Sequence, residues 1–185
     1  MNLSRRTLLA AGLATPALLG VGVGIGALID RRSAAAPAPL PPRDPLRVEW
    51  DDLIPPGVPY AEIIGEGEMD VLADTWKPVF DANGTQFNPV LDGAFIRMPG
   101  YIIPMAFDGT GVSEFLLVPY VGACIHTPPP PPNQLVYVEV DDPWPSNQLW
   151  DAVWVTGEMR AHLTDTHLAE AGYAMAATEI EVFRW

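Results

Sequence analysis

From about residue 94 to the C-terminus, short apolar runs and alternating segments separated by turn residues are typical of β-strands. The last segment is the clearest case, because Ile180 and Val182 share one face while two glutamates occupy the other. Between the fourth and fifth strands we expect a short helix, which Asp165 or Thr166 caps and Gly172 ends. The five predicted strands cover residues 94–107, 112–118, 135–140, 152–159 and 178–185.

The first predicted strand is interrupted by Pro99-Gly100 and by Pro104, so we expect it to bend strongly. Five short strands, a bent first strand and one small helix favour a mainly β fold, a five-stranded Greek-key barrel of the OB-like type over residues 93–185. A β-sandwich is the alternative, since a sequence pattern does not reveal whether a sheet closes. The residues expected to fill the barrel are Phe95, Tyr101, Ile103, Phe115, Leu117, Val136, Val138, Val153, Val155, Ile180 and Val182.

Residues 46–92 give mixed signals and are interpreted as an N-terminal arm of the barrel domain. Apolar residues between Met69 and Phe80 show weak helical spacing. Residues 36–45 read APAPLPPRDP and predict an extended, semi-rigid linker ahead of the arm. The packing residues expected in the arm are Trp50, Leu53, Val71, Leu72, Trp76 and Phe80.

Residues 1–35 have the composition of an export signal. Ser4 to Leu9 contain paired arginines and resemble the twin-arginine type, and an apolar run follows from Leu8 to Ile29. Cleavage after Ala35 would release a periplasmic protein. The alternative is an uncleaved anchor in the inner membrane facing the periplasm, because this run is long enough to cross about 30 Å of hydrocarbon as a helix.

The chain carries 23 acidic and 10 basic side chains, for a net charge of −13. Residues 36–185 keep 22 acidic and 6 basic side chains, so the part beyond the signal has a net charge of −16. Nucleic acids and anionic membrane surfaces select clustered Lys and Arg, so we expect no nucleic-acid partner, and membrane contact only through the N-terminal segment if it is uncleaved. The single cysteine excludes an intramolecular disulfide.

Cys124 and His126 form the candidate metal site. In extended backbone their i, i+2 spacing puts both side chains on one face, with Cα atoms about 6.6 Å apart, from which thiolate and imidazole can converge on zinc or copper. The alternative is that Cys124 packs as a small apolar side chain and His126 bonds a loop carbonyl. Further candidate ligands are His162, His167, Asp108, Glu114, Asp141, Asp142 and, for copper, Met98, Met105, Met159 and Met175.

The segment after Cys124 is also a candidate partner-binding loop, because consecutive prolines favour a stiff polyproline II rod. Trp144 and Trp150 form a candidate aromatic surface for a glycan or a partner peptide, the metal-free alternative. No serine triad, thiol dyad or carboxylate pair is specified, so we expect a protein that is not an enzyme. The candidate loop residues are Tyr120, Pro128, Pro129, Pro130, Pro131, Pro132, Asn133 and Gln134.

Five short runs of the sequence are distinctive: Pro99-Gly100-Tyr101 with Pro104, Phe115 to Tyr120, Gly122 to His126 with the following prolines and Asn133-Gln134, Trp154 to Gly157, and Trp50 to Pro55 in the arm. Together they resemble an exported bacterial family of unknown function, DUF3299. The resemblance implies an envelope protein without established activity, encoded in some genomes near metal-responsive or export transporter genes. A partner in the envelope or a transporter component is therefore expected.

Overall fold

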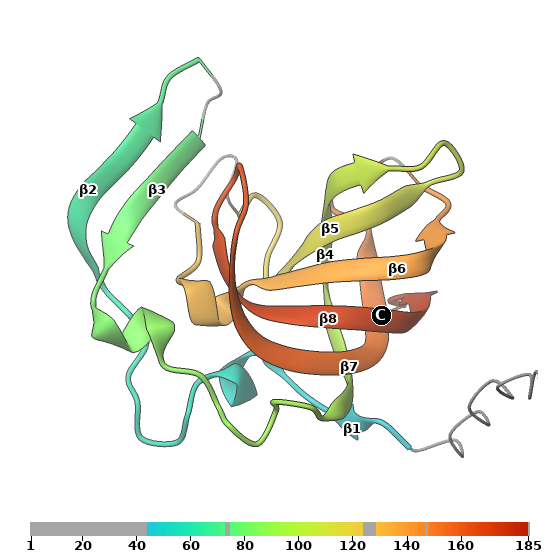
Figure 1. Ribbon diagram of the computed structural model, residues 1–185, viewed down its shortest axis with the longest axis horizontal. Coiled ribbons are helices and arrows are strands. Elements are labelled where there is room, and N and C mark those ends of the chain that lie inside the picture. The colour runs from blue at the N-terminus through green and yellow to red at the C-terminus, as the bar shows by residue number, and fades with distance from the viewer. Residues whose placement is uncertain (1–43, 73–74, 124–128, 147, 185) are drawn as a thin grey trace, which may run out of the picture. The chain divides into compact units, whose positions relative to one another are not determined.

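Five long strands wrap around one apolar interior in the computed structural model, which describes residues 44–72, 75–123, 129–146 and 148–184 (Figure 1). The strands pair in the order β4-β5-β6-β8-β7, and β7 pairs with β4 and closes the barrel. The β6–β8 pairing is parallel and the other four are antiparallel. This order confirms the OB-like barrel, and the β4–β7 pairing excludes an open sandwich.

The described strands are β1 (Leu46–Arg47), β2 (Ile63–Asp70), β3 (Thr75–Phe80), β4 (Phe95–Phe107), β5 (Val112–Val118), β6 (Val136–Trp144), β7 (Ala152–Asp165) and β8 (Glu170–Val182). The short 3₁₀ helices are η1 (Trp50–Leu53), η2 (Ala82–Thr85) and η3 (Pro132–Gln134).

The barrel interior is filled mainly by fully buried aliphatic, methionine and aromatic side chains. On β4 the interior positions are Ile96, Met98 and Ile102, and not Phe95, Tyr101 and Ile103 as predicted. Alternation cannot decide between the two faces here, because Ile103 is also buried, in a second cluster on the opposite face of the strand. The predicted interior residues Phe115, Leu117, Val136, Val138, Val153 and Val155 are fully buried in the interior.

The predicted helix between the fourth and fifth strands is wrong. β7 continues to Asp165 and β8 begins at Glu170, so a tight turn joins the two strands. The Thr166 hydroxyl accepts the backbone N–H groups of Leu168 and Ala169 and donates to the Ala169 carbonyl at 2.6 Å, which closes a hairpin in place of a helix cap. The alanine-rich start of β8 suits a strand because Gly157 on β7 allows close approach: a Cβ there would lie 2.3 Å from the Ala176 oxygen.

The end of β8 changes face at a register shift. Thr156 pairs with Glu179 and Gly157 pairs with Ala177, which leaves Thr178 between two consecutive pairs. Ala177 and Ile180 therefore both contact the interior cluster, as predicted for Ile180. Val182 was expected inside the barrel, but it is 55% exposed.

The N-terminal arm contributes directly to the barrel core. Val48, Leu53 and Leu91 are almost fully buried in the interior cluster, and β1 pairs in parallel with β4. Leu53 thus packs as predicted.

The helical interpretation of residues 69–80 is also wrong, since β2 and β3 form an antiparallel hairpin. Val71 and Leu72 were expected to pack, but they are 81% and 100% exposed at its tip. Among the described residues, no helix is long and apolar enough to cross a membrane.

Candidate functional site

A second apolar cluster covers the outer face of β4 and β5. Ile103, Leu116 and Val118 are buried there beneath Ala123 and Leu135 from the β5–β6 connection. Further contacts come from Trp150 in the β6–β7 connection, from the β7–β8 turn and from Ala171 at the start of β8. This face is therefore occupied by the chain's own connections, and a ligand site has to be sought elsewhere.

The described part of the proline-rich loop is packed into the protein. Pro129–Pro132 are buried, and so are Asn133 and Gln134. The Asn133 amide donates to the carbonyl oxygens of Asn83 and Gln86, at 2.9 and 3.1 Å, and the Gln134 amide donates to Trp50 O at 2.9 Å. These residues fasten the arm to the barrel, and the prolines that the structure describes are packed against the protein.

Cys124, His126 and Pro128 lie outside the described residues. Tyr120, which precedes them, is 40% exposed. In the described part of the chain, no three His, Cys, Asp or Glu side chains are grouped so that they could hold a metal ion. His162 and His167 are exposed, on β7 and in the β7–β8 turn.

The other proposed ligands are used differently. Met98, Met159 and Met175 are buried in the barrel interior, and Met105 packs against the outer cluster.

Hydrogen bonds from the backbone and the hydroxyl of Thr110 lower the pKa of the Asp108 carboxyl. Glu114 accepts a short hydrogen bond from the Tyr137 hydroxyl. Burial is the largest cause of a raised pKa of Tyr137, and this hydrogen bond and the negative charge of Glu114 raise that pKa further. Asp141 and Asp142 are exposed near the end of β6.

Trp144 and Trp150 do not form one aromatic surface. Trp144 is half-buried against the interior cluster, and its indole N–H donates to Asp151 Oδ2 at 2.9 Å. Trp150 is half-buried against the outer cluster, with a positive φ of 69°. Each indole therefore packs against a different apolar cluster, and the two do not share one ligand-binding surface.

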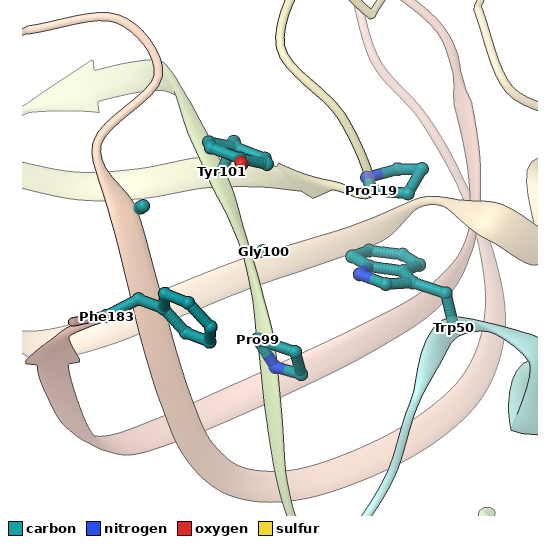
Figure 2. Close-up of a pocket in the computed structure, with 7 residues that line it drawn as sticks. Trp50, Pro99, Gly100, Tyr101, Pro119 and Phe183 are labelled. Atoms are coloured by element: carbon teal, nitrogen blue, oxygen red, sulfur yellow. The ribbon is translucent and has the colours of Figure 1, made fainter. Parts of the chain in front are cut away.

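A small aromatic pocket lies where the arm meets β4 (Figure 2). Its volume of about 150 Å³ fits a single side chain. Gly100 lies in the middle of the residues that line the pocket (Figure 2). A Cβ at this position would come within 3.0 Å of Trp50 Cζ2 and 2.6 Å of Leu117 Cγ. The pocket is lined by Trp50, Pro99, Gly100, Tyr101, Pro119, Ala152 and Phe183.

Beside this pocket, two of the few basic side chains stack on an indole. The guanidinium carbons of Arg47 and Arg97 lie 5.0 and 4.9 Å from the Trp154 ring centroid. Arg47 also pairs with Glu49 at 2.9 Å, and Arg97 pairs with Glu181 at 2.7 Å. Because both charges are already neutralised, this cluster offers no unpaired cation to an anionic ligand.

A larger groove of about 520 Å³ separates the β2–β3 hairpin from the barrel. Lys77 on β3 crosses it: Nζ donates to Asp165 Oδ1 at 2.6 Å and to Thr166 O at 2.7 Å. The groove therefore contains one cation against the carboxylates of Glu68, Asp165 and Glu170. Its lining residues are Gly67, Glu68, Lys77, Pro78, Val79, Phe80, Thr85, Pro129, Pro130, Pro132, Asp165, Ala169 and Glu170.

The hairpin beside the groove exposes large apolar side chains. Ile64 and Met69 on β2 are 66% and 68% exposed, and the tip residues Val71 and Leu72 are still more accessible. Apolar side chains grouped on a projecting element are typical of an interaction surface. With its mixed apolar and acidic lining, the groove and hairpin together form the candidate binding site, which we call the hairpin groove.

The hairpin groove was not predicted from the sequence, because the spacing of apolar residues in 69–80 was interpreted as weakly helical. A strand signal was present in the β-branched and aromatic residues Thr75, Trp76, Val79 and Phe80. The partner of Lys77 lies 88 residues away on β7, so no local pattern could have identified it.

The pairing order defines an OB-like closed β-barrel with an added N-terminal hairpin. The chain belongs to the DUF3299 family, because the model of that family, described as a protein of unknown function, matches residues 50–182. A search of curated proteins found no match.

Among solved structures, the chain is similar to a DUF3299 family protein from Pseudomonas aeruginosa PAO1, determined by crystallography at 2.45 Å resolution. The two share 34% sequence identity with a TM-score of 0.64, and the match covers 77% of this chain and 99% of that one.

Proposed function

We propose that this protein is a non-catalytic binding module of the bacterial envelope, and that its hairpin groove binds a partner protein. The observation that carries the proposal is the exposure of Ile64, Met69, Val71 and Leu72 beside a groove with a mixed apolar and acidic lining. Burying these four side chains against a partner would remove apolar surface from water at about 25 cal/mol per Å².

The location in the envelope rests on the N-terminal segment. Paired Arg5 and Arg6 followed by an apolar run support export by the twin-arginine route, to the periplasm or to an anchored position facing it. The prolines of residues 36–45 would then act as a spacer between the exported barrel and the membrane. A partner encountered there would be another envelope protein, such as a transporter component.

Site-specific photo-crosslinking in living cells tests the proposal. A photoreactive amino acid is placed at Val71 or at Leu72, and at Asp141 on β6 as an exposed control away from the hairpin. We expect one adduct of the same mass from both tip positions, identified by mass spectrometry and weakened when Met69→Asp is introduced. Adducts of equal yield from Asp141, or none from either tip position, would contradict the proposal.

A second candidate function is binding of zinc or copper by Cys124 and His126. Its support is their i, i+2 spacing in the sequence, from which a thiolate and an imidazole can reach one metal ion. Metal content of the purified protein is compared with that of Cys124→Ser and His126→Ala. Stoichiometric metal that both variants lose would support the site, and equal substoichiometric metal in all three proteins would remove it.

A further inference from the structure

Strand β2 has an open edge. Among the described residues its one strand neighbour is β3, and the two form a sheet separate from the barrel. A two-stranded sheet is marginally stable in water, and a third strand adds main-chain hydrogen bonds along the edge. β2 spans eight residues, Ile63–Asp70, and its pairing with β3 shifts register between Ile63 and Gly65 and between Gly65 and Glu68, so an added strand would follow these shifts.

The charge of this edge selects what can pair with it. Glu66, Glu68 and Asp70 lie on β2, and Glu62 directly precedes it. If two copies of the protein paired through their β2 edges, carboxylates would face carboxylates, which is destabilising. The acidic edge therefore disfavours a second copy and favours a strand that carries Lys or Arg.

The groove has the same preference. Lys77, the basic residue in its lining, is held by Asp165 and by the Thr166 carbonyl. Among the residues that the structure describes, neither Glu68 nor Glu170 forms an ion pair. Glu68 lies on β2 and its side chain lines the groove. In a strand added beside β2, the side chains on the same face of the sheet as Glu68 would therefore also face the groove. Basic side chains at alternate positions would meet these carboxylates.

We infer that β2 accepts an extended basic segment of the partner protein as a third strand of the hairpin sheet. This inference rests on the proposed function and specifies its ligand as a segment with Lys or Arg alternating with apolar residues. The main chain supplies hydrogen bonds to β2, while the basic side chains provide the charge match and the apolar ones cover Ile64 and Met69.

Binding of labelled octapeptides to the full chain tests the inference by fluorescence anisotropy at about 0.15 M salt. The probe alternates lysine and valine. One control peptide replaces lysine by glutamate, and a second keeps the lysines but carries N-methylated valines, which cannot donate main-chain hydrogen bonds. We expect the probe to bind at least tenfold more tightly than either control and to slow amide exchange in Ile63–Asp70.

Two double variants with equal changes in charge separate the edge from general electrostatics. Glu66→Lys with Glu68→Lys should weaken probe binding at least tenfold, whereas Asp141→Lys with Asp142→Lys, on exposed positions of β6, should change it less than threefold. Equal losses in the two variants, or equal binding of the N-methylated peptide, would overturn the inference. A stable dimer that the first variant dissociates would also overturn it, in favour of a second copy.

Failure of this inference is distinguishable from failure of the proposed function. If tip positions form a specific adduct in cells while all three peptides bind equally, the partner-binding function stands and the strand-pairing mode is wrong. If no tip adduct forms and the probe fails to bind, both are wrong.

Discussion

The Tyr173 hydroxyl joins the barrel to two separate segments of the arm. It donates to the Leu53 carbonyl oxygen at 2.7 Å and accepts the backbone N–H of Asn88, also at 2.7 Å. The side chain is fully buried, and its ring contacts that of Phe87 edge-on at 5.4 Å. The arm is therefore fastened to the inside of the barrel, because these polar groups satisfy each other where water has no access.

Replacing Tyr173 with Phe should destabilise the protein by about 1 to 3 kcal/mol, because it leaves the buried Leu53 carbonyl and the half-buried Asn88 N–H without this partner. Urea unfolding measures the change. Tyr101→Phe is the matched control, since Tyr101 is half-buried and should change the free energy of unfolding by less than about 0.5 kcal/mol. Equal effects of the two substitutions would show that the hydroxyl of Tyr173 does not hold the arm.

The same residue predicts a loss of stability at alkaline pH. Burial raises the pKa of Tyr173 to about 12, against an ordinary value of 10.0. Between these values the unfolded chain releases the proton while the folded protein keeps it. The free energy of unfolding therefore falls as pH rises from about 10 to about 12.

Unfolding measured at pH 9, 10, 11 and 12 should show this fall in the wild type and a shallower one in Tyr173→Phe. A residual slope is expected in the variant because burial also raises the pKa of Tyr60, to about 12, with a further contribution from Tyr120. Identical slopes in the two proteins would contradict the assignment to Tyr173.

The strands of the barrel could be predicted because short apolar runs and alternating segments report local geometry, and β5 was predicted with its exact bounds from a nearly all-apolar run. What failed depends on neighbours distant in sequence. The face of β4 is decided by the connections that bury Ile103 on its outer side. The start of β8 resembles a helix in its alanines, but it is a strand because Gly157 allows close pairing.

The candidate site was less accessible to sequence reasoning. Composition correctly indicated an unusually acidic protein, but not that carboxylates would gather along β2 and the groove. Consecutive prolines were interpreted by their stiffness, whereas Pro132 begins η3, which packs against η2 and β8. Long-range packing decides which polar and apolar residues remain available to a ligand.

Gly100 should not tolerate a side chain. An alanine Cβ would lie 2.6 Å from Leu117 Cγ and 3.0 Å from Trp50 Cζ2, so the arm or the core would have to shift. We expect Gly100→Ala to cost about 1 to 3 kcal/mol in thermal or urea unfolding, as overpacking usually does. Gly65→Ala is the control, because its Cβ would meet Val79 at an ordinary 3.4 Å. A Gly100→Ala protein as stable as wild type would show that Trp50 can move aside without cost.

Lys77 should hold the hairpin against the barrel without adding much to global stability. Its ion pair with Asp165 is largely exposed on the acidic side, at 78% of that side chain, so Lys77→Met should cost less than about 1 kcal/mol in urea unfolding. Because Lys77 also bonds the Thr166 carbonyl, its loss should speed amide exchange in β2 and β3 selectively.

Arg160→Met is the matched control for Lys77→Met, since Arg160 pairs with Glu158 within β7 and, among the described residues, forms no ion pair with another strand. In the Arg160→Met protein, the amides of β2 and β3 should exchange at the same rates as in the wild type. If Lys77→Met also leaves hairpin exchange unchanged, the groove is held open by other contacts. If exchange rises and the lysine–valine octapeptide binds less tightly, Lys77 holds the hairpin in the position that presents the acidic edge of β2 to its partner.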